Sequence, residues 1–181
     1  MISIVIPEPM AALLRRHFFQ NSLEQGAFLF ARVDQKGDSL DFFVVDQYLV
    51  PESGWERQHE VYLQMKDSER AKIMKTARDK GLSAIDCHSH PGADDDVWFS
   101  PSDVSGISEF APYAKWKLSG RPFAATVWAE RSIDAVAWHG DFSKAHPVSE
   151  IRIVGAETAS LVPKNSWFGS PRGWHRFESH E

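Results

Sequence analysis

Hydrophobic and polar residues follow two different rhythms along the chain, one typical of strands and the other of helices. Eight segments are rich in β-branched, aromatic or alternating apolar residues, as strands are. Three further segments repeat apolar residues at spacings of three and four, which predicts helices with one buried face. The predicted strands are residues 2–6, 26–33, 40–50, 59–65, 83–87, 123–129, 133–138 and 151–154, and the predicted helices are residues 10–18, 69–80 and 101–116.

The connections between these segments indicate the fold class. Short polar segments, residues 34–38 and 130–132, separate two pairs of predicted strands, so we expect two β-hairpins. Because helices and strands interleave and hairpins are present, we predict a single α+β domain with a mixed, curved sheet flanked by helices. We expect this domain to cover residues 1–162 and residues 163–181 to form a C-terminal tail, docked or flexible.

Two local expectations concern the region after the first predicted hairpin. Residues 51–57 show no regular period, so we expect a loop that exposes Trp55 to solvent. Asp67 or Ser68 is expected to cap the second helix, because short polar side chains accept hydrogen bonds from the first-turn amides of a helix.

Composition excludes several classes of function. The chain has 181 residues, 43% of them hydrophobic and 25% charged, and a formal net charge of -5, which predicts an ordinary globular domain without affinity for nucleic acid. A single cysteine excludes an internal disulfide and is typical of a reducing compartment. No signal peptide or membrane-length apolar run is present, so we expect a cytoplasmic protein without membrane contact.

The most informative stretch follows the predicted strand 83–87. His88 and His90 are two residues apart, and side chains at this spacing lie on the same face of a strand. A catalytic zinc ion takes three protein ligands and leaves a fourth position for water. A carboxylate from another element is therefore needed, and Asp103 is the candidate, because it falls in the first turn of a predicted helix that Ser100 caps and Pro101 begins.

Each part of this pattern also has a purely structural interpretation. Two histidines at this spacing can lie on a strand without binding a metal. Ser100 and Asp103 form a Ser-x-x-Asp capping box, in which the carboxylate bonds to the backbone of the cap residue. Glu24, which precedes the first predicted hairpin, can be a solvated loop carboxylate. The conjunction of the parts favours the metal site.

This combination resembles the JAMM motif of the JAB/MPN zinc metalloproteases, which is His-x-His, seven residues, Ser, two residues, Asp. In this chain nine residues separate His90 from Ser100, an insertion of two residues in the loop 92–99. The family also has an upstream glutamate near a strand that begins with glycine, and Glu24 before Gly26 matches that arrangement. The resemblance covers residues 24–136 and implies the MPN fold.

The resemblance also implies a role for each residue. Zinc is held by His88, His90 and Asp103; Glu24 is the general base and acid; and Ser100 donates a hydrogen bond to the oxyanion. It implies a deubiquitinase-like isopeptidase or peptidase acting at the C-terminus of a ubiquitin-like protein, with activating and conjugating enzymes of the same pathway as further partners. The alternatives are release of cysteine or a peptide from a sulfur-carrier protein, and a non-catalytic MPN-type scaffold.

Neighbouring residues carry further expectations. Cys87 should face away from the histidines and be buried, because alternation places it on the other side of the strand. Asp86 is either a supporting group of the site or an ordinary strand residue. Residues 94–96 are three aspartates and are expected to form a solvated acidic loop, whereas Trp98 and Phe99 are either core residues or, as we favour, a lid over the cleft.

Overall fold

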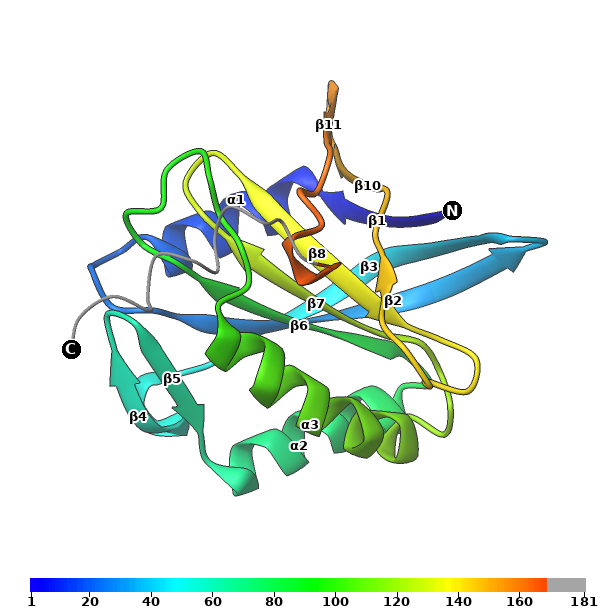
Figure 1. Ribbon diagram of the computed structural model, residues 1–181, viewed down its shortest axis with the longest axis horizontal. Helices are drawn as coiled ribbons and strands as arrows, with labels where there is room; N and C mark the ends of the chain where they lie inside the picture. Colours follow the sequence, from blue (N-terminus) through cyan, green and yellow to red (C-terminus); the bar gives the residue numbers. More distant parts are fainter. Residues whose placement is uncertain (169–181) are drawn as a thin grey trace.

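A mixed sheet of nine strands forms the framework of the part of the chain that the computed structural model describes, residues 1–168 (Figure 1). The strand order is β11-β10-β1-β3-β2-β6-β7-β8-β9. The strands are β1 (Ile2–Pro7), β2 (Gly26–Lys36), β3 (Ser39–Leu49), β6 (Ser83–Ser89), β7 (Phe123–Trp128), β8 (Ile133–Trp138), β9 (His146–Pro147), β10 (Glu150–Val154) and β11 (Thr158–Leu161). Residues 169–181, most of the predicted tail, lie outside the described residues.

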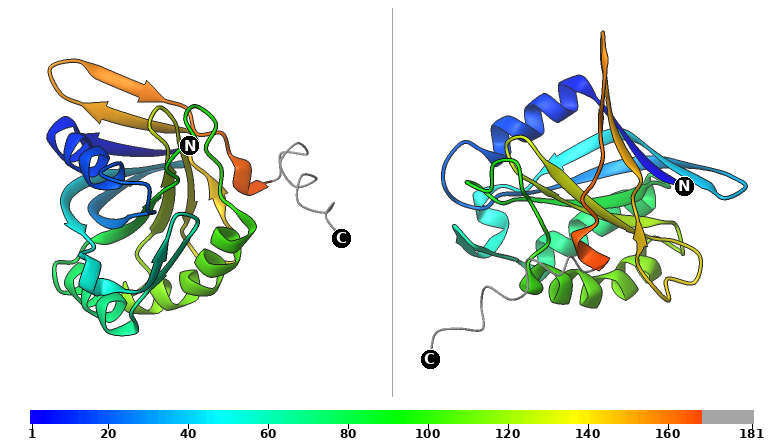
Figure 2. Two further views of the ribbon diagram at one scale, coloured as in Figure 1. Left: turned by 90° about the vertical axis from the view of Figure 1, so that its left-hand side faces the viewer. Right: turned by 45° about the horizontal axis from the view of Figure 1, so that its top comes forward.

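The sheet contains both parallel and antiparallel pairings. The predicted hairpins are confirmed, since β2 pairs antiparallel with β3 and β7 pairs antiparallel with β8. β1 is parallel to both of its neighbours, β3 and β10, and β6 is parallel to β7. The predicted α+β class with a mixed, curled sheet is therefore confirmed, although β9 and β11 were not expected. The β10–β11 hairpin extends away from the rest of the sheet (Figure 2).

Helices cover both faces of the sheet, which explains why its central strands are apolar on both sides. On β2, Ala27 and Leu29 pack in one core with residues of α1 (Glu8–Phe18), whereas Phe28 and Phe30 pack in the other with α2 (Asp67–Asp79) and α3 (Pro101–Lys117). Figure 1 shows α1 on one side of the sheet and α2 and α3 on the other.

The first helix forms as its apolar spacing predicts. Ala11, Leu14 and Phe18 are its buried residues, at intervals of three and four. Pro9 lies in the first turn, where its missing N–H leaves no hydrogen bond unmade. Basic residues in the last turn complement the helix dipole. Within residues 1–168, no helix combines the length and apolarity needed to cross a membrane.

The region before α2 corrects two expectations. Trp55 is only 8% exposed, because it begins a small hairpin of β4 (Trp55–His59) and β5 (Tyr62–Met65) and packs in the core below α2 and α3. Its indole lies against Gly26, where an added Cβ would be 2.4 Å from the Trp55 Cη2 atom. The expected cap of α2 is also wrong, because Lys66 occupies the N-cap position and no side chain caps that end.

Candidate metal centre

The two histidines of the predicted site lie at the end of β6, between β2 and β7. His88 is the next-to-last residue of this strand, and His90 follows its end. Backbone hydrogen bonds fix both positions: Ser89 N–H donates to the Gln25 carbonyl at 3.0 Å, and His90 N–H donates to the Trp128 carbonyl at 2.8 Å. The imidazoles are therefore carried by a segment that is hydrogen-bonded to Gln25 on one side and to Trp128 on the other.

The predicted carboxylate ligand lies in the first turn of α3. Ser100 Oγ accepts a hydrogen bond from Asp103 N–H at 3.2 Å, and Asp103 Oδ2 accepts one from Ser100 N–H at 2.7 Å. This reciprocal pair is a complete capping box. The structural interpretation of Ser-x-x-Asp is thus confirmed, and the same box turns the Asp103 carboxylate toward the histidines.

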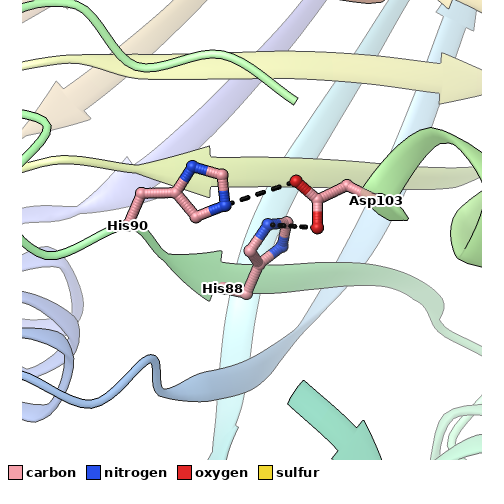
Figure 3. A group of neighbouring side chains, drawn as sticks. All are labelled: His88, His90 and Asp103. Atoms are coloured by element: carbon pink, nitrogen blue, oxygen red, sulfur yellow. Dashed lines mark ion pairs between the residues drawn. The ribbon is translucent and has the colours of Figure 1, made fainter. Parts of the chain in front are cut away.

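One carboxylate faces both imidazoles (Figure 3). Asp103 Oδ1 lies 3.3 Å from His88 Nε2, and Asp103 Oδ2 lies 3.3 Å from His90 Nε2. Each residue offers one ligand atom, and these atoms all lie within 4.8 Å of one another. Zinc bonds of about 2.0–2.2 Å in a tetrahedron place ligand atoms about 3.4 Å apart. The observed spacing fits such a cation.

The state of His88 supports the same assignment. Its side chain is buried, and Nε2 has no hydrogen-bond partner among the described residues, although the Asp103 oxygen is close. A buried imidazole nitrogen without a hydrogen bond is unusual, because an unsatisfied polar atom costs stability. Coordination of a divalent metal by this nitrogen would remove that cost. The donor set of two imidazoles and one carboxylate is one that zinc accepts.

The charges of the three groups are strongly coupled. Burial favours the neutral form of Asp103, but the neighbouring His88 and His90 outweigh it and hold the pKa of the carboxyl well below its usual range. Burial likewise opposes the charge of His88, and Asp103 outweighs it, raising its pKa to about 9. For His90 burial dominates and lowers the pKa. The carboxylate is thus ionised at neutral pH, as a metal ligand must be.

The structure also brings Glu24 to this site. Its Oε1 atom lies 3.6 Å from His90 Nε2, and the residue is 6% exposed. The backbone of Glu24 is held by the small hairpin: its N–H donates to the His59 carbonyl at 3.0 Å, and its carbonyl accepts from Gln58 Nε2 at 2.9 Å. Glu24 is therefore no solvated loop carboxylate.

Burial sets the protonation of Glu24. It raises the pKa of the carboxyl to about 7, with the charge of His88 acting against this rise and that of Asp103 adding to it. A carboxyl group with this pKa exchanges its proton near neutral pH. That property is needed in a general acid and base.

Ser100 has a different position from the other predicted residues. Its oxygen serves the capping box, and its hydroxyl proton remains available for a second hydrogen bond. Within residues 1–168, no hydrogen bond joins it to His88, His90 or Glu24. Its predicted role as oxyanion donor therefore stays a prediction.

A cavity of about 140 Å³ adjoins the metal candidates and brings in two residues that the sequence reasoning did not assign. Asp86 lines it together with His88, which lies two residues further along the strand and therefore on the same face. Arg70 of α2 also lines it, with its guanidinium 5.0 Å from the centre of the Phe110 ring. Strand periodicity could have placed Asp86 there, whereas no sequence pattern pointed to Arg70.

In the loop before α3, the three aspartates 94–96 are exposed, as expected of a solvated acidic loop, whereas the expected lid is corrected. Phe99 is 3% exposed and its ring centre lies 6.2 Å from that of His88, so it is a core residue, while Trp98 is 44% exposed. Two of the three aspartates have cationic partners: Arg131 Nε lies 2.6 Å from Asp95, and Lys164 pairs with Asp96. The lid expectation is thus wrong for Phe99.

Cys87 behaves as predicted. It is fully buried, and it packs in the core on the α1 side of the sheet. Burial in apolar surroundings raises the pKa of its thiol. A buried thiol in this state is a poor nucleophile, which does not favour a catalytic role for Cys87.

Comparisons with known proteins extend only to the fold. No protein-family model and no curated protein matches this sequence. Among solved structures, the chain is similar to a Desulfitobacterium hafniense protein whose solution structure was determined by a structural genomics consortium, with a TM-score of 0.50 and 16% sequence identity over 85% of this chain and 94% of that one. This likeness concerns the arrangement of strands and helices.

Proposed function

We propose that this protein is a zinc-dependent isopeptidase or peptidase, similar to the JAB/MPN metalloproteases, that cleaves an amide or isopeptide bond at the C-terminus of a ubiquitin-like protein. The observation that carries the proposal is the Asp103 carboxylate, 3.3 Å from Nε2 of both His88 and His90. Glu24, buried beside His90, supplies the acid–base group that hydrolysis of an amide requires.

His88, His90 and Asp103 would hold the zinc ion. A zinc ion held there would supply a polarised water molecule whose pKa is lowered to about 7. Asp103 is ionised at neutral pH, and the His88 nitrogen has no competing hydrogen bond among the described residues. With a pKa of about 9, His88 must release its proton when the metal binds.

Glu24 would move the proton. With a pKa of about 7, its carboxylate can accept a proton from the attacking water and afterwards donate it to the leaving amine. Its burial matters here, because a solvated glutamate would be too weak a base at neutral pH. Ser100, whose hydroxyl proton is not used in the capping box, would donate to the oxyanion, a bond whose loss typically costs about two to three orders of magnitude in rate.

The non-catalytic scaffold is less favoured on physical grounds. Four ionisable side chains meet at one buried point, His88, His90, Asp103 and Glu24. Replacing buried charged groups by apolar residues is often neutral or stabilising, so a scaffold would gain nothing from keeping them. Release of cysteine or a peptide from a sulfur carrier would use the same groups. The free Cys87 is compatible with a reducing compartment, and we therefore place the enzyme in the cytoplasm.

Metal analysis tests the ligand set. We expect purified wild-type protein to contain about one zinc ion per chain, and His88→Ala or Asp103→Ala to contain almost none. His139→Ala is the matched control, because this histidine follows β8 and is not part of the ligand group, and it should keep the metal. Full zinc content in both ligand variants would refute the assignment.

Hydrolysis of a ubiquitin-like fusion protein tests the chemistry. Glu24→Gln should retain zinc and lose activity, because the amide cannot accept the proton. Glu56→Gln, an exposed position on β4, is the control and should remain active. A Glu24→Gln protein with wild-type activity would show that another group is the base.

A further inference from the structure

A short segment near the described end of the chain is joined to the metal centre through a line of contacts. This segment, residues 163–168, lies beside β8 (Figure 1). It contacts both the loop 92–99 and the sheet. Residues 163–168 of the predicted tail are therefore packed against the domain.

Asp134 of β8 anchors this segment. Its side chain is fully buried, and its carboxylate accepts hydrogen bonds from the N–H groups of Asn165 and Ser166, both at 2.8 Å, and from the Ser166 hydroxyl. In residues 1–168, no lysine, arginine or histidine pairs with it. A buried carboxylate without a cationic partner needs hydrogen-bond donors, so the bonds from Asn165 and Ser166 determine where the segment lies.

Ser166 links Asp134 to Phe99, which lies beside the metal centre. While its hydroxyl donates to Asp134, its oxygen accepts the N–H of Phe99 at 3.0 Å. Trp167 then packs edge-on against the Phe99 ring, with 5.3 Å between the ring centres. Phe99 is thereby held both at its backbone and at its side chain.

Phe99 lies beside His88 and next to the cap residue of α3. Its ring centre lies 6.2 Å from that of His88, and it directly precedes Ser100, the cap residue that orients Asp103. Any shift of Phe99 therefore acts on a ligand from β6 and on a ligand from α3 at once. Groups that orient metal ligands from behind commonly change metal affinity when they are removed.

We propose that Ser166 and Asp134 are positioning residues of the metal centre, which act through Phe99 on His88 and Asp103. The inference rests on the metal site of the proposed function, but not on its peptidase activity. Residues 163–168 are accordingly a part of the site's scaffold. Neither residue contacts the ligand group directly.

Zinc affinity of the full-length protein, measured by competition with a chromophoric chelator, tests this proposal. We expect Ser166→Ala to weaken zinc binding about 10- to 100-fold and Ser166→Thr, which keeps the hydroxyl, to restore it. Ser160→Ala is the matched control, because Ser160 also donates a side-chain hydrogen bond but lies on β11, remote from Phe99. Asp134→Asn should weaken binding in the same direction as Ser166→Ala.

A spectroscopic readout separates positioning from general stability. Co²⁺ in place of zinc reports ligand geometry through its visible absorption bands, and we expect these bands to change in Ser166→Ala while remaining unchanged in Ser160→Ala. Wild-type affinity and a wild-type Co²⁺ spectrum in Ser166→Ala would overturn this inference and leave the metal site in place. A wild-type protein that binds neither metal would overturn the metal site, and the inference with it.

Discussion

Burial of the Glu24 carboxyl has a consequence for stability that does not depend on any metal. The folded protein holds the Glu24 proton up to a pKa of about 7, whereas the usual value is 4.5. Between these two pH values the unfolded chain has lost the proton and the folded chain has kept it. Folding stability therefore falls as the pH rises through this window and stays constant above it.

The size of the effect follows from the same pKa. At about 1.4 kcal/mol for each pH unit, a rise from 4.5 to about 7 corresponds to a loss of about 3 kcal/mol. In Glu24→Gln the side chain does not titrate, so this loss disappears. The other ionisable groups of the site are present in both proteins, so the comparison isolates Glu24 together with its coupling to His88.

Urea unfolding, followed by tryptophan fluorescence in the presence of a metal chelator, measures this difference. Going from about pH 4.5 to about pH 8, we expect the stability of Glu24→Gln to rise by about 3 kcal/mol relative to wild type. The exposed control Glu56→Gln should follow the wild-type curve. Parallel pH profiles for wild type and Glu24→Gln would refute the argument that burial controls this carboxyl.

Two further predictions concern residues beside the site. Gly26→Ala should destabilise the protein by about 1–3 kcal/mol, because the new methyl group would lie 2.4 Å from the buried Trp55 ring, and an unchanged urea midpoint would contradict this. Cys87 should resist thiol reagents in the native protein and react readily in urea, because its thiol is fully buried. Rapid labelling of the native protein would contradict its position.

The parts of the fold that were predicted correctly depend on local sequence. The hairpins, β6 and α3 have a strong period and clear turn residues, and the structure contains them. The ligand group was also found locally, because His88, His90 and Asp103 lie on two consecutive elements, the strand and the helix that follows it. A spacing of this kind can be read directly from the chain.

The parts that were missed depend on contacts between distant residues. Trp55 has polar neighbours in sequence, and only the fold places its ring against Gly26 and the core. Ser166 lies in a segment without any period, and its docking is decided by Asp134, 32 residues away. Arg70 reaches the cavity because α2 packs beside α3. No local pattern contains this information.

The position of β1 has a consequence for how the molecule is made. This strand comes first in the sequence, yet it lies inside the sheet, parallel to β3 on one side and to β10 on the other. During synthesis on a ribosome, the edge of β1 that pairs with β10 has no partner until residue 154 has been added. An unfinished chain would present a bare apolar edge, which invites pairing with other chains. Chaperone dependence should therefore be greatest late in translation.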